Sequence, residues 1–218
     1  MSIRSRIAGV GVAFVLLTAP GFAGQFSFTG VFANDNDVQL FTFGLLAPTT
    51  VTLQTWSYGG GTDANGQTIA AGGFEPLLEV FDALSLAPAS GLLLPGTFSS
   101  CPPNQADTNR IPACYDVLAQ LSLTAGNYFL ALTQNPNAAV GNLGDGFQFD
   151  SDPTFNSGFV GSFGAQGDGH WEVDILAADN AAAVTATPEP GSLWLSAAAM
   201  LLAGIGFRKV RPRAGSCS

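Results

Sequence analysis

Short runs of alternating apolar and polar residues, separated by glycine, proline, asparagine and aspartate, fill the middle of this chain. In the first run, Phe26 and Phe28 alternate with Ser27 and Thr29. Because successive side chains of a β-strand point to opposite faces, this period of two predicts strands with one buried face. Strands are expected at 25–32, 38–45, 50–58, 77–81, 117–123, 128–133 and 170–176, with a short one at 68–70 inside a glycine-rich loop, 59–73. This spacing predicts an all-β fold, an antiparallel β-sandwich.

The sequences between these strands predict a turn, a loop and a linker. Thr124-Ala125-Gly126-Asn127 predicts a hairpin turn between its two neighbouring strands, because Gly and Asn tolerate a positive φ. The segment 147–163 is expected to be a loop, and the small residues of 179–187 predict a linker. The expected division is therefore a signal segment at 1–23, a sandwich domain at 24–178, the linker, and a tail at 188–213.

The N-terminus has the pattern of a secretory signal peptide. Arg4 and Arg6 precede an apolar run from 7 to 17, and Gly21-Phe22-Ala23 places small residues at the positions that signal peptidase requires. We expect cleavage after Ala23 and export through the Sec translocon.

The C-terminal tail has three parts in a fixed order. Pro188-Glu189-Pro190 is followed by an apolar run, 193–207, and then by four basic residues, Arg208, Lys209, Arg211 and Arg213. As a helix, this run would be about 22 Å long, against a hydrocarbon core of about 30 Å. We expect a short transmembrane helix whose basic flank favours a cytoplasmic C-terminus.

This order of tripeptide, apolar helix and basic cluster resembles the PEP-CTERM sorting signal of Gram-negative bacteria. The resemblance covers roughly 187–213, and an ordinary membrane anchor with a proline-rich stalk is the alternative. It implies recognition of Pro188, Glu189 and Pro190 by exosortase, a membrane transpeptidase. It also implies transient residence in the inner membrane, delivery to the cell surface or the outside, and association with an exopolysaccharide matrix.

A second resemblance covers most of the body. Asp35-Asn36-Asp37-Val38, Gly72-Gly73-Phe74-Glu75-Pro76 and Leu123-Thr124-Ala125-Gly126-Asn127-Tyr128 occur in that order. The order resembles an uncharacterised group of secreted PEP-CTERM proteins and, more distantly, the bacterial pre-peptidase C-terminal β-sandwich. This likeness implies a jelly-roll-like sandwich and no catalytic activity of its own.

The charge of the body narrows the set of partners. Between 24 and 187, fifteen acidic residues stand against the single basic Arg110, which leaves a net charge of −14. A polyanion of this kind is repelled by nucleic acid, so nucleic-acid binding is excluded.

The cysteines indicate a disulfide. Cys101 and Cys114 lie in the exported body, where oxidising conditions favour pairing, whereas Cys217 lies beyond the basic cluster. Neither body cysteine has a basic neighbour in sequence that would make it a nucleophile, so a structural disulfide is expected.

Two groups of polar residues are candidates for chemistry. His170, Glu172 and Asp174 share one face of the strand 170–176, and the solvated face of an edge or outer strand explains them, with a metal or acid–base cluster as the alternative. Asp35, Asp37, Asp150 and Asp152 lie in turns whose oxygens suit Ca²⁺, although aspartate also caps turns for local reasons.

Aromatic residues supply the last candidate. Trp56 and Tyr58 precede Gly59-Gly60-Gly61 and would make a platform for stacking sugars, although a Trp in a β-sandwich is more often part of the core. No nucleophile and base stand together in the sequence. The sequence therefore predicts a secreted, non-catalytic protein of the envelope or extracellular matrix, with a carbohydrate-binding module that uses Trp56 and Tyr58 as the alternative.

Overall fold

The computed structural model of this protein describes residues 24–89, 115–161 and 164–184. Over these residues the fold is all-β with antiparallel sheets, as the alternation predicts, and its only helical element is one 3-10 turn, η1 (Leu143–Asp145). One four-stranded sheet, sheet A, has the order β1 (Gly24–Val31), β9 (His170–Ala178), β3 (Thr49–Thr55), β7 (Leu118–Leu123). The other, sheet B, has the order β10 (Asn180–Val184), β2 (Gln39–Leu45), β8 (Gly126–Gln134), β6 (Pro76–Asp82).

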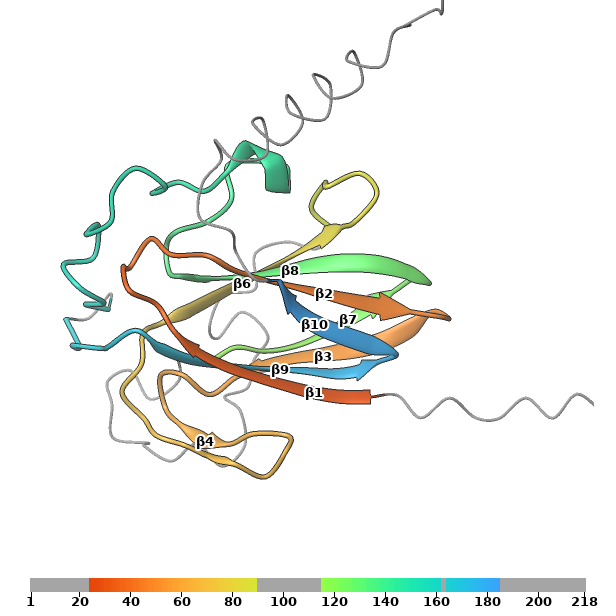
Figure 1. The fold of residues 1–218 in the computed structure, drawn as a ribbon, viewed down its shortest axis with the longest axis horizontal. Helices are drawn as coiled ribbons and strands as arrows, with labels where there is room; N and C mark the ends of the chain where they lie inside the picture. Colours follow the sequence, from red (N-terminus) through yellow and green to blue (C-terminus); the bar gives the residue numbers. More distant parts are fainter. Residues whose placement is uncertain (1–23, 90–114, 162–163, 185–218) are drawn as a thin grey trace, which may run out of the picture. The chain divides into compact units, whose positions relative to one another are not determined.

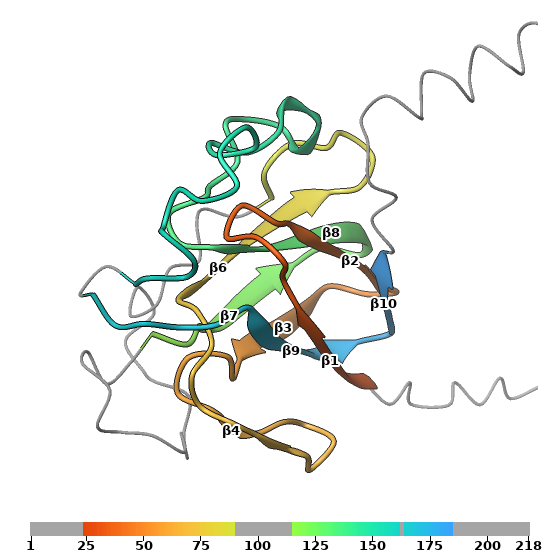
Figure 2. The ribbon, with the colours of Figure 1, turned by 60° about the vertical axis from the view of Figure 1, so that its left-hand side comes forward.

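A third, two-stranded sheet lies outside these two layers. It is the hairpin of β4 (Gly61–Thr62) and β5 (Thr68–Ile69), formed within the glycine-rich loop. Figures 1 and 2 show β2 and β8 in one layer and β1, β9 and β3 in the next, with the hairpin beyond that second layer. The hairpin therefore lies against the outer face of sheet A, the face that does not meet sheet B.

The chain changes sheet at every step along the two large sheets. β1 lies in sheet A, β2 in sheet B and β3 in sheet A, and the same alternation continues through β6, β7, β8, β9 and β10. Every pairing between neighbours such as β1–β9 and β2–β8 is consequently long-range in sequence. Neighbouring strands of a sheet are held together by contacts between distant segments rather than by local turns.

The inner faces of the two sheets share one hydrophobic core. Val51, Leu53, Val173 and Ile175 of sheet A are all fully buried in it. From sheet B, Phe41 meets Trp171 with an interplanar angle of 85° and a centroid distance of 5.8 Å, the edge-to-face arrangement that aromatic pairs favour. The alternating apolar residues of the sequence are the ones that fill this core.

All seven principal strands occur where the sequence predicts them, within three residues at each end. The turn at 124–127, however, is not a hairpin, because β7 belongs to sheet A and β8 to sheet B. The Tyr128 hydroxyl donates to the Thr124 carbonyl at 2.9 Å and fixes this corner between the sheets. Periodicity cannot distinguish the two arrangements, since both require a tight turn between strands that face one core.

The predicted linker at 179–187 is wrong in its first half. The chain forms β10 there and pairs with β2 at the edge of sheet B. Asp179 directs it, because its amide N donates to the Gly44 carbonyl at 3.0 Å and its carboxylate accepts from the Leu46 amide at 2.6 Å. The small residues that suggested a linker suit an edge strand packed closely beside its neighbour.

Candidate functional site

The acidic face of β9 is buried, which corrects the expectation of a solvated face. Glu172 is 0% exposed and Asp174 is 2% exposed. The reason is topological: β9 is an inner strand between β1 and β3, and the glycine-rich loop with the β4–β5 hairpin covers its outer side. Alternation along one strand shows which residues share a face, but it does not show what packs on that face.

The carboxylate of Asp174 accepts hydrogen bonds from three other segments of the chain. It accepts hydrogen bonds from the Ser27 hydroxyl of β1, from the Trp56 indole N–H at 3.1 Å and from the Ala64 amide N–H at 3.1 Å. These donors replace the water that the charge loses on burial. Asp174 therefore holds the hairpin on sheet A through these hydrogen bonds.

Glu172 has no comparable set of donors. Among the described residues, neither carboxyl oxygen of Glu172 has a hydrogen-bond partner, although its backbone amide donates to the Ser57 hydroxyl at 3.1 Å. Burial first, and then the carboxylates of Asp174, Asp63 and Asp116, raise the pKa of Glu172 to about 11. Glu172 is consequently a neutral acid at physiological pH.

Asp116 holds the chain where it leaves β3. Its Oδ1 accepts from the Thr55 hydroxyl and the Tyr58 amide, each at 3.0 Å, and its Oδ2 accepts from the Gly59 amide at 2.6 Å. Asp116 is 1% exposed, so these bonds lie out of contact with water. This carboxylate sets the start of the glycine-rich loop and thus the position of the hairpin.

No cation offsets these acids in the part of the chain described. All seven Lys and Arg residues lie outside it, whereas fourteen of the sixteen Asp and Glu lie within it. The negative charge is therefore balanced by hydrogen-bond donors and by the proton on Glu172. The potential in and around this site is strongly negative.

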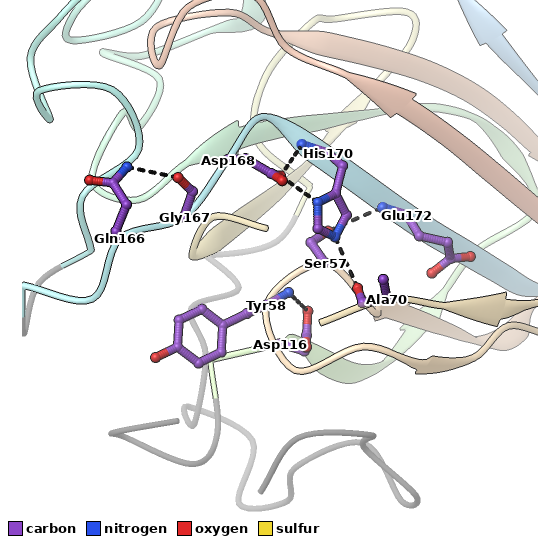
Figure 3. Close-up of polar contacts among 9 residues, drawn as sticks. All are labelled: Ser57, Tyr58, Ala70, Asp116, Gln166, Gly167, Asp168, His170 and Glu172. Atoms are coloured by element: carbon purple, nitrogen blue, oxygen red, sulfur yellow. Dashed lines mark hydrogen bonds and ion pairs between the residues drawn. The ribbon is translucent and has the colours of Figure 1, made fainter. Parts of the chain in front are cut away.

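The His170 ring makes polar contacts through both of its nitrogens. Figure 3 shows its ring between Asp168 and the glycine-rich loop. Nδ1 contacts the Asp168 carboxylate, which also accepts from the His170 backbone amide at 2.9 Å, and Nε2 lies 3.0 Å from the Ala70 carbonyl. Both ring nitrogens therefore face oxygen atoms of neighbouring groups. His170 links β9 to the loop.

Trp56 and Tyr58 lie in the interior, so neither offers a face on which a sugar could stack. Trp56 is 4% exposed and Tyr58 is 1% exposed, and the Tyr58 ring packs at 5.3 Å from that of Tyr115. The glycine-rich loop folds over Trp56. A Cβ on Gly61 would lie 2.3 Å from the Trp56 ring, so only glycine permits this approach.

An open groove of about 450 Å³ remains between the hairpin and sheet A. Its walls carry Gln25, Gln54, Thr62 and Asp63, and its floor includes Trp56 and Asp174. Sequence reasoning missed Gln54, Asp63 and Asp116 as members of the site. A signal was present, because Gly59–Gly61 and Gly72–Gly73 flank the segment 62–71 and allow it to lie flat on a neighbouring sheet.

The two acidic turns lie side by side, which their separation in sequence did not predict. The Asn36 amide donates to the carbonyls of Phe149 and Asp150 at 3.0 and 3.1 Å. Asp35 is 1% exposed, and its Oδ2 accepts from the amides of Asn156 and Gly158 at 2.8 and 3.2 Å. Asn36 and Asp35 therefore tie the β1–β2 loop to the segment 149–158.

The other three acidic residues of these turns accept hydrogen bonds from backbone amides close to them in sequence. Asp37 accepts from Ala33 at 2.7 Å, Asp150 from Phe147 at 2.9 Å and Asp152 from Thr154 at 3.3 Å, all through backbone amides. These are the local caps that aspartate makes in turns. Among the described residues, no three His, Cys, Asp or Glu side chains form a group that could hold a metal ion. A Ca²⁺ role for Asp35, Asp37, Asp150 and Asp152 stays a prediction from sequence.

The remaining sequence predictions fall outside the described residues. They are the signal segment, the pair Cys101 and Cys114, and the tail with Pro188, Glu189 and Pro190. Within the described ranges, no helix is long and apolar enough to cross a membrane.

Comparison of this chain with family models, with curated proteins and with solved structures found no match. The function is therefore argued from its own residues.

Proposed function

We propose that this protein is a secreted, non-catalytic component of the bacterial envelope or extracellular matrix, sorted by the PEP-CTERM and exosortase route. The observation that carries the proposal is the tail, in which Pro188-Glu189-Pro190, an apolar run and a basic cluster follow one another. A signal-like segment at the other end supports it. The enclosed body has few basic residues and a large negative charge, which suits a soluble exported domain.

The position of the last described strand supports processing at the tail. β10 ends at Val184, and only three residues, 185–187, separate it from Pro188. Cleavage near the tripeptide would remove no residue of either large sheet. The domain would leave the membrane with its core complete.

A jelly-roll-like sandwich is the architecture that we infer for the domain. The change of sheet at every successive strand, and the core between the two four-stranded sheets, support this assignment. The connection from β6 to β7 runs through the segment 90–114, which includes both body cysteines. A disulfide between Cys101 and Cys114 would close a loop within this single connection.

The state of the buried acids supports a non-catalytic role. Asp174 and Asp116 already accept several donors each, and Glu172 is fully enclosed. A general acid or base must come within hydrogen-bond reach of a substrate atom. The rival hypothesis, a hydrolase that uses this acidic face, requires the hairpin to leave sheet A. Esterase or glycosidase activity in the purified protein, lost in Glu172→Gln or Asp174→Asn, would establish that rival.

The proposal predicts two cleavages that intact mass spectrometry can detect. We expect protein from the medium or cell surface to begin at Gly24 and to end near Pro190, with a mass two hydrogens below the fully reduced value. Replacing Pro188, Glu189 and Pro190 together by alanine should leave the tail attached and the protein in the inner membrane. Pro153→Ala, in an exposed loop, is the matched control and should be processed normally. Normal processing of the triple variant would make the tail an ordinary anchor cut elsewhere and would contradict the exosortase route.

A further inference from the structure

The groove between the β4–β5 hairpin and sheet A presents polar groups that the fold itself does not use. Gln54 is 8% exposed and lines the groove, yet within the described residues its side-chain amide makes no hydrogen bond to protein. The amide is not among the fully buried polar atoms that lack a partner, so it reaches solvent in the groove and can exchange water for a ligand. Gln54 is therefore placed to bind something that enters the groove.

The groups around Gln54 are of the same kind. Asp63 is 7% exposed, and its Oδ1 accepts from the Gln67 amide at 2.7 Å, which leaves Oδ2 as an acceptor on the wall. Gln25 of β1 and Thr62 of β4 line the groove with exposed side chains. Two amides, one hydroxyl and one carboxylate oxygen thus face a common space.

The charge of the site excludes anionic ligands. Asp63 lines the groove, Asp174 forms part of its floor, and the described residues contain no Lys or Arg. An anion would approach several uncompensated carboxylates in a partly desolvated cleft. Asp174 is in turn unavailable as a ligand for a cation, because its oxygens already accept from Ser27, Trp56 and Ala64. The free acceptors and donors suit an uncharged ligand.

We propose that this groove binds an uncharged, hydroxyl-rich saccharide. The Gln54 amide would exchange hydrogen bonds with adjacent hydroxyls, Asp63 Oδ2 would accept from another, and Gln25 and Thr62 would extend the contact along the cleft. Trp56 contributes its buried edge to the floor rather than a face for stacking, so this site differs from the aromatic platform predicted from sequence. The groove is open, which allows an internal segment of a polymer to lie across it.

The position of the hairpin is fixed before any ligand arrives. Asp174 holds the Ala64 amide, and Asp63 closes the turn of the hairpin through the Gln67 amide. Because the hairpin is already ordered, ligand binding costs little conformational entropy. The saccharide site depends on this fixed geometry and not on the route of export, so binding and sorting can be tested apart.

Isothermal titration of the purified mature protein tests the site with neutral hexasaccharides, maltohexaose and cellohexaose, and with hexagalacturonate as the anionic counterpart. We expect at least one neutral ligand to bind with a Kd below about 1 mM, and the uronate to bind at least about tenfold more weakly. Gln54→Ala should weaken the neutral ligand about five- to tenfold, because one buried amide is lost from the contact.

Gln120→Ala is the matched control. Gln120 is exposed on β7, on the same outer face of sheet A as Gln54 but outside the groove lining, and should bind as the wild type does. Thr62→Val, at the exposed rim, removes a groove hydroxyl without opening the interior and provides a second test should Gln54→Ala fold poorly. The proposal is overturned if neither neutral hexasaccharide binds, if the uronate binds equally well, or if the groove variants match Gln120→Ala.

Discussion

Replacing Glu172 by glutamine is expected to make this protein more stable at neutral pH. Wild-type Glu172 must carry a proton in the folded state, because burial and the neighbouring carboxylates raise its pKa to about 11. In the unfolded chain, the same group loses its proton near its ordinary pKa of about 4.3. Folding at neutral pH therefore takes up a proton, and glutamine removes that requirement while keeping the shape of the side chain and its neutral state.

The direction of the pH dependence follows from this uptake. Between the two pKa values the folded state binds more protons than the unfolded state, so the free energy of unfolding falls as the pH rises. The Glu172 contribution is fully present below about pH 4 and is lost progressively toward pH 11. The slope is about 1.4 kcal/mol per pH unit, or about 3 kcal/mol over the two units from roughly pH 5.5 to 7.5.

Urea unfolding of the two proteins at several pH values measures this difference. We expect Glu172→Gln to exceed the wild type by about 3 kcal/mol at neutral pH and to show a flatter pH profile. Glu79→Gln is the matched control. Burial also raises the pKa of Glu79, but its carboxylate accepts a hydrogen bond from the Ala139 amide at 2.8 Å. Glu79→Gln should therefore raise the free energy of unfolding by less than Glu172→Gln does. Equal pH slopes for wild type and Glu172→Gln would contradict the assignment of Glu172 as a buried neutral acid.

Replacing Asp116 by asparagine is expected to lower the free energy of unfolding by a large amount. One oxygen of the asparagine side chain still accepts from the Thr55 hydroxyl and the Tyr58 amide, but its NH₂ group then faces the Gly59 amide. Two donors meet, out of contact with water, and the bond at 2.6 Å is lost. Loss of a bond to a charged acceptor, together with an unsatisfied buried donor, costs about 3 kcal/mol.

The matched control for Asp116 is Asp82, which caps an exposed turn. Its Oδ1 accepts from the amides of Leu84 and Ser85, each at 2.9 Å, and these bonds lower the pKa of Asp82. Water can replace them in Asp82→Asn, so the denaturation midpoint should move much less than in Asp116→Asn. Similar shifts for the two variants would show that Asp116 does not hold the glycine-rich loop. Asp116→Asn should also weaken saccharide binding at the groove, because the start of the glycine-rich loop that carries the hairpin is no longer held in place.

The strands of this fold could be predicted from the sequence because the signal is local. Each strand buries one face, and alternation such as Phe26, Phe28 against Ser27, Thr29 records that burial within a few residues. Which strands pair with one another in a sheet could not be predicted in this way. The same alternation in 117–123 and 128–133 fits a hairpin or a corner between sheets, and only the packing of both sheets on one core selects the corner.

The candidate site was largely beyond the reach of sequence reasoning. His170, Glu172 and Asp174 were correctly placed on one face of a strand, but the pattern gave no information about the hairpin that covers them. Gln54, Asp63 and Asp116 lie far from β9 in sequence and reach it only through the order of strands in sheet A. For Trp56, the sequence favoured the core over a sugar-stacking platform formed with Tyr58, and the structure buries both residues.

By itself, the sequence determined the all-β class, the positions of the strands and the acidic charge. Each of these depends on residues close together in the chain or on their totals. The tertiary structure alone decided which strand lies inside a sheet, which carboxyl is left without donors and where an unused amide faces a groove. These depend on which distant segments meet. Burial removes water from a charged or polar group only when another part of the chain arrives to cover it.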